Sequence, residues 1–219
     1  MGFIFYKKGY KMIDPDNHIV SRSLFAGIAI GIGGYLFLSC SNAILGSILF
    51  SAGLCSVVIF RGNLFTGKSG FVSDTQDLRR LVLVLLLNVF AAFILGLISR
   101  LLNPSITSTA DAILNVRIST GYLPYIIKSI ITGYLMTLAI ESETKPNSNH
   151  LILILSVVAF INAGCLHCIA DSFYYGAGTL LYDQPLSLIL RLLVVILFNF
   201  VGCNLYNLFV NKSFIHASE

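Results

Sequence analysis

Long stretches of apolar residues constrain this chain more than any other feature of its sequence. A helix that crosses the hydrocarbon core of a bilayer, about 30 Å thick, needs about 20 predominantly apolar residues. Six stretches approach that length: 24–39, 43–60, 81–99, 122–140, 151–170 and 186–210. Because 56% of the residues are hydrophobic, only 11% are charged and the mean hydropathy is +0.85, a soluble domain could not bury this much apolar surface. The sequence therefore predicts an all-α membrane protein with six transmembrane helices.

The positive charges predict how these helices are oriented. Residues 1–22 contain Lys7, Lys8 and Lys11, and no apolar segment with a small-residue cleavage site marks a signal peptide. Loops on the cytoplasmic side of a membrane carry an excess of Lys and Arg. We therefore expect three parts: a cytoplasmic N-terminal tail, a transmembrane domain and a short cytoplasmic C-terminal tail, at 1–22, 23–211 and 212–219. The net charge of +4 follows from this bias, and we expect no nucleic-acid partner.

The two halves of the chain share a pattern that predicts an inverted repeat. Each half starts with a span rich in small residues, SLFAGIAIGIGGY in the first and SIITGYLMTLA in the second. The second span of each half is interrupted, by RGNLFTGKSG at 61–70 and by AGCLHCIADSFYYGAG at 163–178. The third span of each half carries an asparagine before small residues, Asn88 and Asn199.

Three spans per half place the two halves in opposite orientations, so the two interrupted spans should meet near the middle of the bilayer. Irregular backbone at that depth is tolerated only where protein buries it or where it lines a polar cavity. Two facing interruptions therefore indicate a conduction site. The alternative is that each interruption is a glycine-rich surface loop after an ordinary helix.

Two polar side chains near these interruptions are candidates for that site. His167 is the only histidine within a span, and an ionisable residue at membrane depth is by default a functional candidate. The alternative is a structural histidine that is hydrogen-bonded between helices. Thr66 offers a hydroxyl group, and a half-helix that begins near it would present free N–H groups that favour an anion.

Cys165 and Cys168 flank this histidine and suggest a metal or redox site. Zinc would need two more ligands at a matching spacing, and the chain offers no second Cys/His pair. A C-x-x-C redox motif is typical of soluble domains with a βαβ pattern. The GKS sequence after Gly62 fits a phosphate-binding loop only in spacing, because a membrane span stands where that motif needs a strand. We expect no metal, no cofactor and no enzymatic activity.

Five short motifs, in this order, carry a resemblance to a known family: LFTG, LNVFAAFILG, KSIITGYLMTLA, LHCIAD and NFVGC. They are similar to the helix breaks and asparagine motifs of the formate/nitrite transporter family of pentameric anion channels, and the likeness covers 24–210. The resemblance implies an aquaporin-like fold, in which six helices form two inverted three-helix repeats with interrupted second and fifth helices. It also implies a pore in each protomer, a homopentamer and a prokaryotic cytoplasmic (inner) membrane.

The same resemblance implies a role for each residue of the pore. His167 takes the place of the family's central histidine, and Thr66 that of the nearby threonine. The apolar constrictions are assigned to Phe160 and Phe65 on one side and to Phe50 and Leu54 on the other, with Leu64 beside the threonine. Lys128 and Arg117 look like basic residues that raise the local anion concentration, and Asn88 and Asn199 like structural polar residues.

The chain also departs from the family pattern. Leu166 and Asn63 stand where the family has glutamates, Asp171 where it has asparagine, and Gly133 where the fourth helix usually has asparagine. Asn63 and Asp171 are nevertheless expected among the pore residues, because Asp171 lies four positions after His167 and so shares its helical face.

These observations predict passive, bidirectional movement of a small monovalent anion of the formate, nitrite or hydrosulfide class, or of its conjugate acid, across a lipid bilayer. A bare anion that crosses apolar rings pays a large desolvation cost, which a weak acid avoids when it is protonated or hydrogen-bonded at His167. Two alternatives stay open: a pore for neutral solutes such as hydrogen sulfide or ammonia, and a membrane metal or redox protein that uses Cys165 and Cys168. The sequence contains no pair of Asn-Pro-Ala motifs, which would have indicated a water or glycerol pore.

Overall fold

Four continuous helices and two shorter ones form the spans. The computed structural model describes residues 18–72, 74–143 and 150–215, so most of the predicted N-terminal tail, Lys145 and the last four residues lie outside the described part. The continuous helices, each long and apolar enough to cross a membrane, are α1 (Ile19–Leu38), α4 (Thr75–Leu102), α6 (Tyr122–Glu143) and α10 (Pro185–Ile215). The shorter apolar helices are α2 (Ala43–Ile59) and α7 (Leu151–Asn162).

Each short helix is followed by a break and then by a second, re-entering piece of helix. After α2 the chain forms α3 (Phe65–Lys68) and the 3₁₀ turn η1 (Ser69–Phe71), and after α7 it forms α8 (Cys168–Ala177). Left-handed backbone at Arg61 (φ 54°) and Gly164 (φ 63°) ends the preceding helices, because that conformation cannot continue a right-handed helix. Almost every residue of these re-entering segments is buried, so the alternative of surface loops is wrong.

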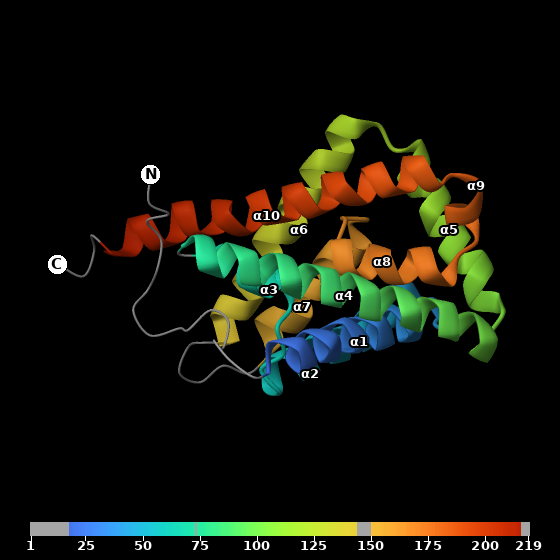
Figure 1. Ribbon diagram of the computed structural model, residues 1–219, viewed down its shortest axis with the longest axis horizontal. Helices are drawn as coiled ribbons and strands as arrows, with labels where there is room; N and C mark the ends of the chain where they lie inside the picture. Colours follow the sequence, from blue (N-terminus) through green and yellow to red (C-terminus); the bar gives the residue numbers. More distant parts are fainter. Residues whose placement is uncertain (1–17, 73, 144–149, 216–219) are drawn as a thin grey trace.

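The helices pack as two equivalent halves, which confirms the predicted six-span architecture with interrupted second and fifth spans. In the first half α1 packs against α2 and α4, and in the second half α6 packs against α7 and α10. The halves are joined where α2 meets α7 and where α4 meets α8. The start of α1 and the end of α10 lie toward the same end of the bundle (Figure 1), as an even number of crossings requires.

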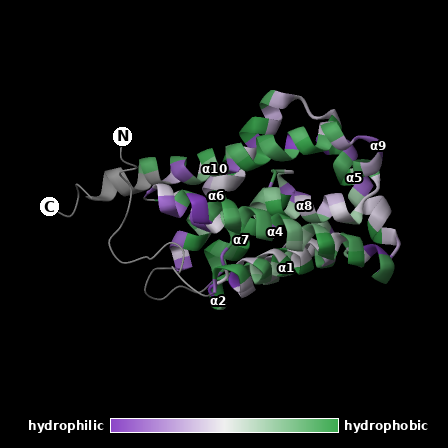
Figure 2. Cartoon of the chain, viewed as in Figure 1, coloured by the Kyte–Doolittle hydropathy of each residue, from purple (hydrophilic) through white to green (hydrophobic). Residues whose placement is uncertain are grey.

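Hydrophobic residues cover the middle of the bundle, whereas the hydrophilic residues gather toward its two ends (Figure 2). Large apolar side chains on the outward faces of α4 and α10 are well exposed, among them Leu86 at 61%, Phe90 at 59% and Leu193 at 56%. Such a belt faces lipid or a neighbouring subunit rather than water. The chain is therefore an integral membrane protein.

The helix α5 (Ser105–Ser119) was not predicted from the sequence, which indicated only a connection between the third and fourth spans. Just before this helix, the side-chain oxygen Oδ1 of Asn103 accepts the backbone N–H of Ser105, the first helical residue, at 3.1 Å. Its buried face, spaced at one side chain per turn, consists of Ile106, Ala110, Leu114 and Arg117. This helix packs against α8 and so brings Arg117 to the second break, while the short α9 (Leu180–Asp183) follows α8.

Two glycines allow α4 and α8 to pack with their backbones in contact. A Cβ atom on Gly96 would overlap the carbonyl oxygen of Phe173, and one on Gly176 would overlap the carbonyl oxygen of Phe93. Neither oxygen can move without shifting a helix.

We predict that Gly176→Ala destabilises the protein, although alanine is the better helix former. Overpacking of this kind costs about 1–3 kcal/mol. Thermal unfolding in detergent should show a lower Tm than the wild type. Gly121→Ala is the matched control, because Gly121 is exposed and its added Cβ would have its nearest neighbour, Pro124, 3.9 Å away. An unchanged Tm for Gly176→Ala would contradict the close packing of α4 and α8.

Candidate functional site

The two breaks meet at a hydrogen bond between Thr66 and His167. Thr66 Oγ1 lies 2.9 Å from His167 Nε2, although the residues are 101 positions apart in the chain. Thr66 is 0% exposed and His167 is 2% exposed. The predicted meeting of the two interruptions inside the bundle is therefore confirmed.

The backbone of α8 determines which ring nitrogen of His167 carries the proton. His167 is the N-cap of α8, and its Nδ1 accepts the backbone N–H of Ala170 at 3.2 Å. An accepting Nδ1 carries no hydrogen, so a neutral ring is protonated at Nε2 and donates to Thr66 Oγ1. The hydroxyl proton of Thr66 is then left for a second acceptor, which none of the described side chains supplies. The pair can thus donate a hydrogen bond to a small molecule beside it.

Asn88 holds the first break in place. Its Oδ1 accepts the N–H of Phe65, the first residue of α3, at 2.8 Å. Its Nδ2 donates to the carbonyl oxygens of Ser23 at 2.7 Å and Asn63 at 3.0 Å. One buried side chain therefore satisfies two groups of the break that lack helical partners, the N–H of Phe65 and the carbonyl of Asn63, and also bonds to the carbonyl of Ser23 within α1.

Asn199 holds the second break with the same three bonds. Its Oδ1 accepts the N–H of Cys168, the first residue of α8, at 3.0 Å, and its Nδ2 donates to the carbonyl oxygens of Ser129 and Leu166, both at 2.8 Å. Phe65 and Cys168 are thus equivalent positions, and the predicted inverted repeat extends to individual hydrogen bonds.

Aromatic side chains cover one side of the histidine. Phe160 stacks on His167 with ring centroids 5.8 Å apart, and Phe50 meets Phe160 edge to face at 6.1 Å. The resemblance had grouped Phe50 and Phe160 on opposite sides of the central pair, and this grouping is corrected: α2 and α7 pack side by side, so their phenylalanines meet. The other three expected constriction residues are buried as well: Leu54 at 1%, Leu64 at 1% and Phe65 at 4% exposed.

A cavity of about 170 Å³ reaches His167 from α5, α7 and α8. Its walls include Phe160, Cys165, Arg117 and Asp171. We refer to it as the vestibule. It is large enough for a small solute, since one water molecule takes about 30 Å³ in the liquid.

The expected anion-attracting residues both lie at the second break. Arg117 is only 9% exposed, and its Nη2 contacts Asp171 Oδ1 at 3.3 Å. It also donates to the carbonyl oxygens of Gly164 at 3.2 Å and Cys165 at 3.4 Å. Lys128 approaches the same loop, because a Cβ on Gly164 would lie 3.4 Å from its Nζ. Much of the charge of Arg117 is therefore balanced within the protein rather than presented to bulk water.

The structure gives a reason for one of the departures from the family pattern. A Cβ at Gly133 would overlap the carbonyl oxygen of Asn199, so this crossing of α6 and α10 has no room for an asparagine side chain. Asn63 and Leu166 are equivalent positions, since the carbonyl of each bonds to an asparagine of the frame. The family's glutamate is thus replaced at the same place in both halves, and the structure does not explain why.

Arg191 was not among the residues predicted from the sequence, although a charged residue inside an apolar span is a recognisable signal. Its guanidinium group lies 5.0 Å from the ring centroids of both Tyr122 and Tyr125. It donates to the carbonyl oxygens of Thr120 at 3.0 Å and Ile118 at 2.6 Å, which end α5. Arg191 therefore anchors the helix that carries Arg117.

The described residues contain no group of three His, Cys, Asp or Glu side chains that could hold a metal ion. All five cysteines are free. Cys165 lines the vestibule, whereas Cys168 is fully buried and begins α8.

Comparisons with known proteins agree with this geometry. The sequence model of the family described as "Formate/nitrite transporter" matches residues 7–212. The solved structure of a "Pentameric formate channel with formate bound" is similar at 22% identity and a TM-score of 0.67, over 91% of this chain and 94% of that chain. An "FNT family ion channel" is similar at 21% identity and a TM-score of 0.72, over 87% of both chains. No curated protein sequence matches significantly.

We predict that Asn88→Ala and Asn199→Ala are each strongly destabilising. Every unsatisfied buried backbone group costs about 1–3 kcal/mol, and each substitution leaves two of them, one N–H and one carbonyl of the break. Yield of folded protein and Tm in detergent measure the effect. Asn115→Ala, on the exposed face of α5, is the control and should leave both unchanged. Wild-type stability for either frame variant would show that the breaks do not depend on these side chains.

Proposed function

The chain belongs to the formate/nitrite transporter family, and from this premise we propose that it is a passive, bidirectional channel for a small monovalent anion or its conjugate acid. The match covers nearly the whole chain. The buried bond between Thr66 and His167 supports the same function, because it supplies a polar group where a conduction path needs one.

The barrier to permeation explains the proposed role of His167. The central pair lies among buried apolar side chains. Phe160 stacks on His167, Phe50 packs on Phe160, and Leu64 and Phe65 directly precede Thr66 in the chain. An anion would lose its hydration there at a cost of many kcal/mol, since charge is unfavourable in a low-dielectric region. A donor at the centre lowers this cost, and a solute that enters as the neutral acid avoids it, since the neutral acid crosses apolar rings readily.

The proposed path runs from the vestibule to the central pair. Lys128 raises the concentration of anions near the second break, whereas Arg117, whose charge Asp171 largely balances, offers hydrogen-bond donors there. The Nε2–H of His167 donates to Thr66 Oγ1, so the Thr66 hydroxyl proton is the one that is donated to the solute. Asn63 lies buried in the first break. Asp171 lines the vestibule and faces the solute before it reaches the histidine.

We also propose the membrane in which the channel lies and the way it assembles. The protein resides in the prokaryotic cytoplasmic (inner) membrane with both termini in the cytoplasm, in keeping with its basic N-terminal segment. It assembles as a homopentamer, as in the similar "Pentameric formate channel with formate bound", and each protomer has its own pore. Residues 23–211 form the channel domain, between short tails at 1–22 and 212–219. It carries solutes without transforming them, so it is not an enzyme.

We predict that His167→Asn slows formate flux into proteoliposomes by at least about tenfold, the effect of losing one hydrogen bond worth about 1.5 kcal/mol. Asparagine keeps an acceptor for the N-cap bond to Ala170. It has no imidazole N–H, so the hydrogen bond from Nε2 to Thr66 Oγ1 is lost. Stopped-flow measurements across pH 5 to 8 follow the rate. Wild-type flux should rise as the pH falls, because each unit increases the small fraction of undissociated acid about tenfold.

His18→Ala serves as the control, since His18 is exposed at the start of α1. Flux and pH dependence equal to those of the wild type in His167→Asn would remove this histidine from the permeation mechanism.

A further inference from the structure

The ion pair between Arg117 and Asp171 is only half made. A guanidinium group can hold both oxygens of a carboxylate through two parallel hydrogen bonds. Here Nη2 contacts Oδ1 at 3.3 Å, whereas Arg117 Nε and Asp171 Oδ2 have no hydrogen-bond partner among the described residues. Both of these atoms are buried, which makes an unmet donor and an unmet acceptor costly.

The unmet atoms belong to two residues that line the vestibule beside His167. Asp171 is 0% exposed and Arg117 is 9% exposed, so bulk water does not satisfy them. A small solute in the vestibule meets these two atoms once the side chains of Arg117 and Asp171 turn toward it.

The chemistry of this pair selects one form of the solute. An undissociated carboxylic acid carries an O–H donor and a carbonyl acceptor side by side, which complement Oδ2 of Asp171 and Nε–H of Arg117. A carboxylate anion carries acceptors only, so it could satisfy Arg117 but would face the negative oxygen of Asp171.

We propose that Arg117 and Asp171 form a recognition site for the undissociated form of a small carboxylic acid. Asp171 Oδ2 accepts the acid's O–H, and Arg117 Nε donates to its carbonyl oxygen. The acid then moves on to the Thr66–His167 pair without giving up its proton. This inference rests on the proposed channel function and adds to it the form of the substrate that is recognised. Hydrogen sulfide has no carbonyl oxygen and fits the site poorly.

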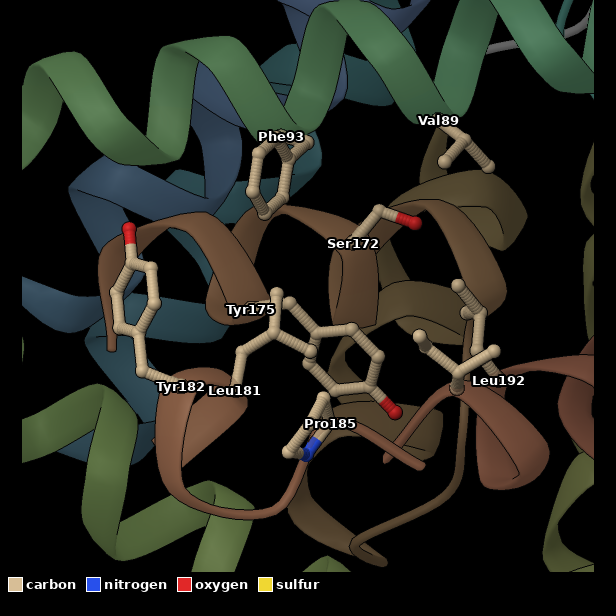
Figure 3. A pocket seen from close by; sticks show the side chains of 9 residues that line it. Val89, Phe93, Ser172, Tyr175, Leu181, Tyr182, Pro185 and Leu192 are labelled. Atoms are coloured by element: carbon tan, nitrogen blue, oxygen red, sulfur yellow. The ribbon is translucent and has the colours of Figure 1, made fainter. Parts of the chain in front are cut away.

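A second cavity, on another face of α8, provides a matched control. It has a volume of about 480 Å³ and lies between α4, α8, α9 and α10 (Figure 3). Ser172, the neighbour of Asp171 in the chain, lines this apolar cavity and donates to the carbonyl oxygen of Cys168 at 2.7 Å. Ser172→Ala therefore perturbs the same helix without touching the vestibule.

The test measures formate flux into proteoliposomes at pH 7 with two competitors. Formamide is neutral and presents an N–H donor beside a carbonyl, as the acid does, whereas nitrate has acceptors only. Wild-type channels and Ser172→Ala should be inhibited more strongly by formamide than by nitrate. Asp171→Asn turns its amide N–H₂ toward the solute in place of an acceptor, so formamide inhibition should weaken and nitrate inhibition strengthen, each by about tenfold.

Stronger inhibition of the wild type by nitrate than by formamide would overturn the proposal, and that comparison needs no variant. Folded Asp171→Asn protein, judged by size-exclusion chromatography and circular dichroism, that keeps the wild-type order of inhibition would overturn it too. Absence of formate flux in wild-type vesicles above that of empty vesicles would instead refute the proposed channel function.

Discussion

The structure depends on one constraint: backbone N–H and C=O groups inside a membrane must find partners within the protein. Where the two helices break, backbone groups lose their helical hydrogen-bond partners. One asparagine in each half supplies new partners for them. Asn88 and Asn199 each accept one N–H and donate to two carbonyl oxygens, so that irregular backbone survives in the middle of the bundle. Without these side chains the breaks would close into helices or unfold.

The breaks place a hydroxyl and an imidazole where only apolar side chains would otherwise stand. Thr66 lies in the first turn of α3, and His167 caps α8. The backbone of the two breaks therefore orients the hydroxyl group and the imidazole ring. The cap bond to Ala170 has a chemical consequence, because an accepting Nδ1 leaves Nε2 as the donor. Arg117 and Asp171 extend this polar region into the vestibule as a pair with little net charge. The path thus combines weak overall charge with directed hydrogen bonding, which suits a weak acid better than a bare ion.

Much of this arrangement could be predicted from the sequence, because it depends on patterns among residues that are close together in the chain. Apolar runs gave the six spans, and glycine-rich interruptions and repeated asparagines gave the breaks and the meeting of Thr66 with His167. The contacts between distant segments were harder to predict. Arg117 and Asp171 are 54 positions apart, and their pairing needed helix α5, whose one-per-turn apolar spacing was overlooked. The contact between Phe50 and Phe160 depends on how closely α2 and α7 pack, which periodicity does not encode.

The central claim is that Thr66 and the Nε2 of His167 share a hydrogen bond whose direction is set by the cap of α8. Solid-state nuclear magnetic resonance of ¹⁵N-histidine-labelled protein in lipid bilayers tests it directly, with the His167 signals assigned by their loss in His167→Asn. The account predicts a ring that carries its proton on Nε2, not on Nδ1, and a through-space correlation from Nε2 to the side chain of Thr66. A ring protonated on Nδ1, or the lack of any correlation with Thr66, would contradict it.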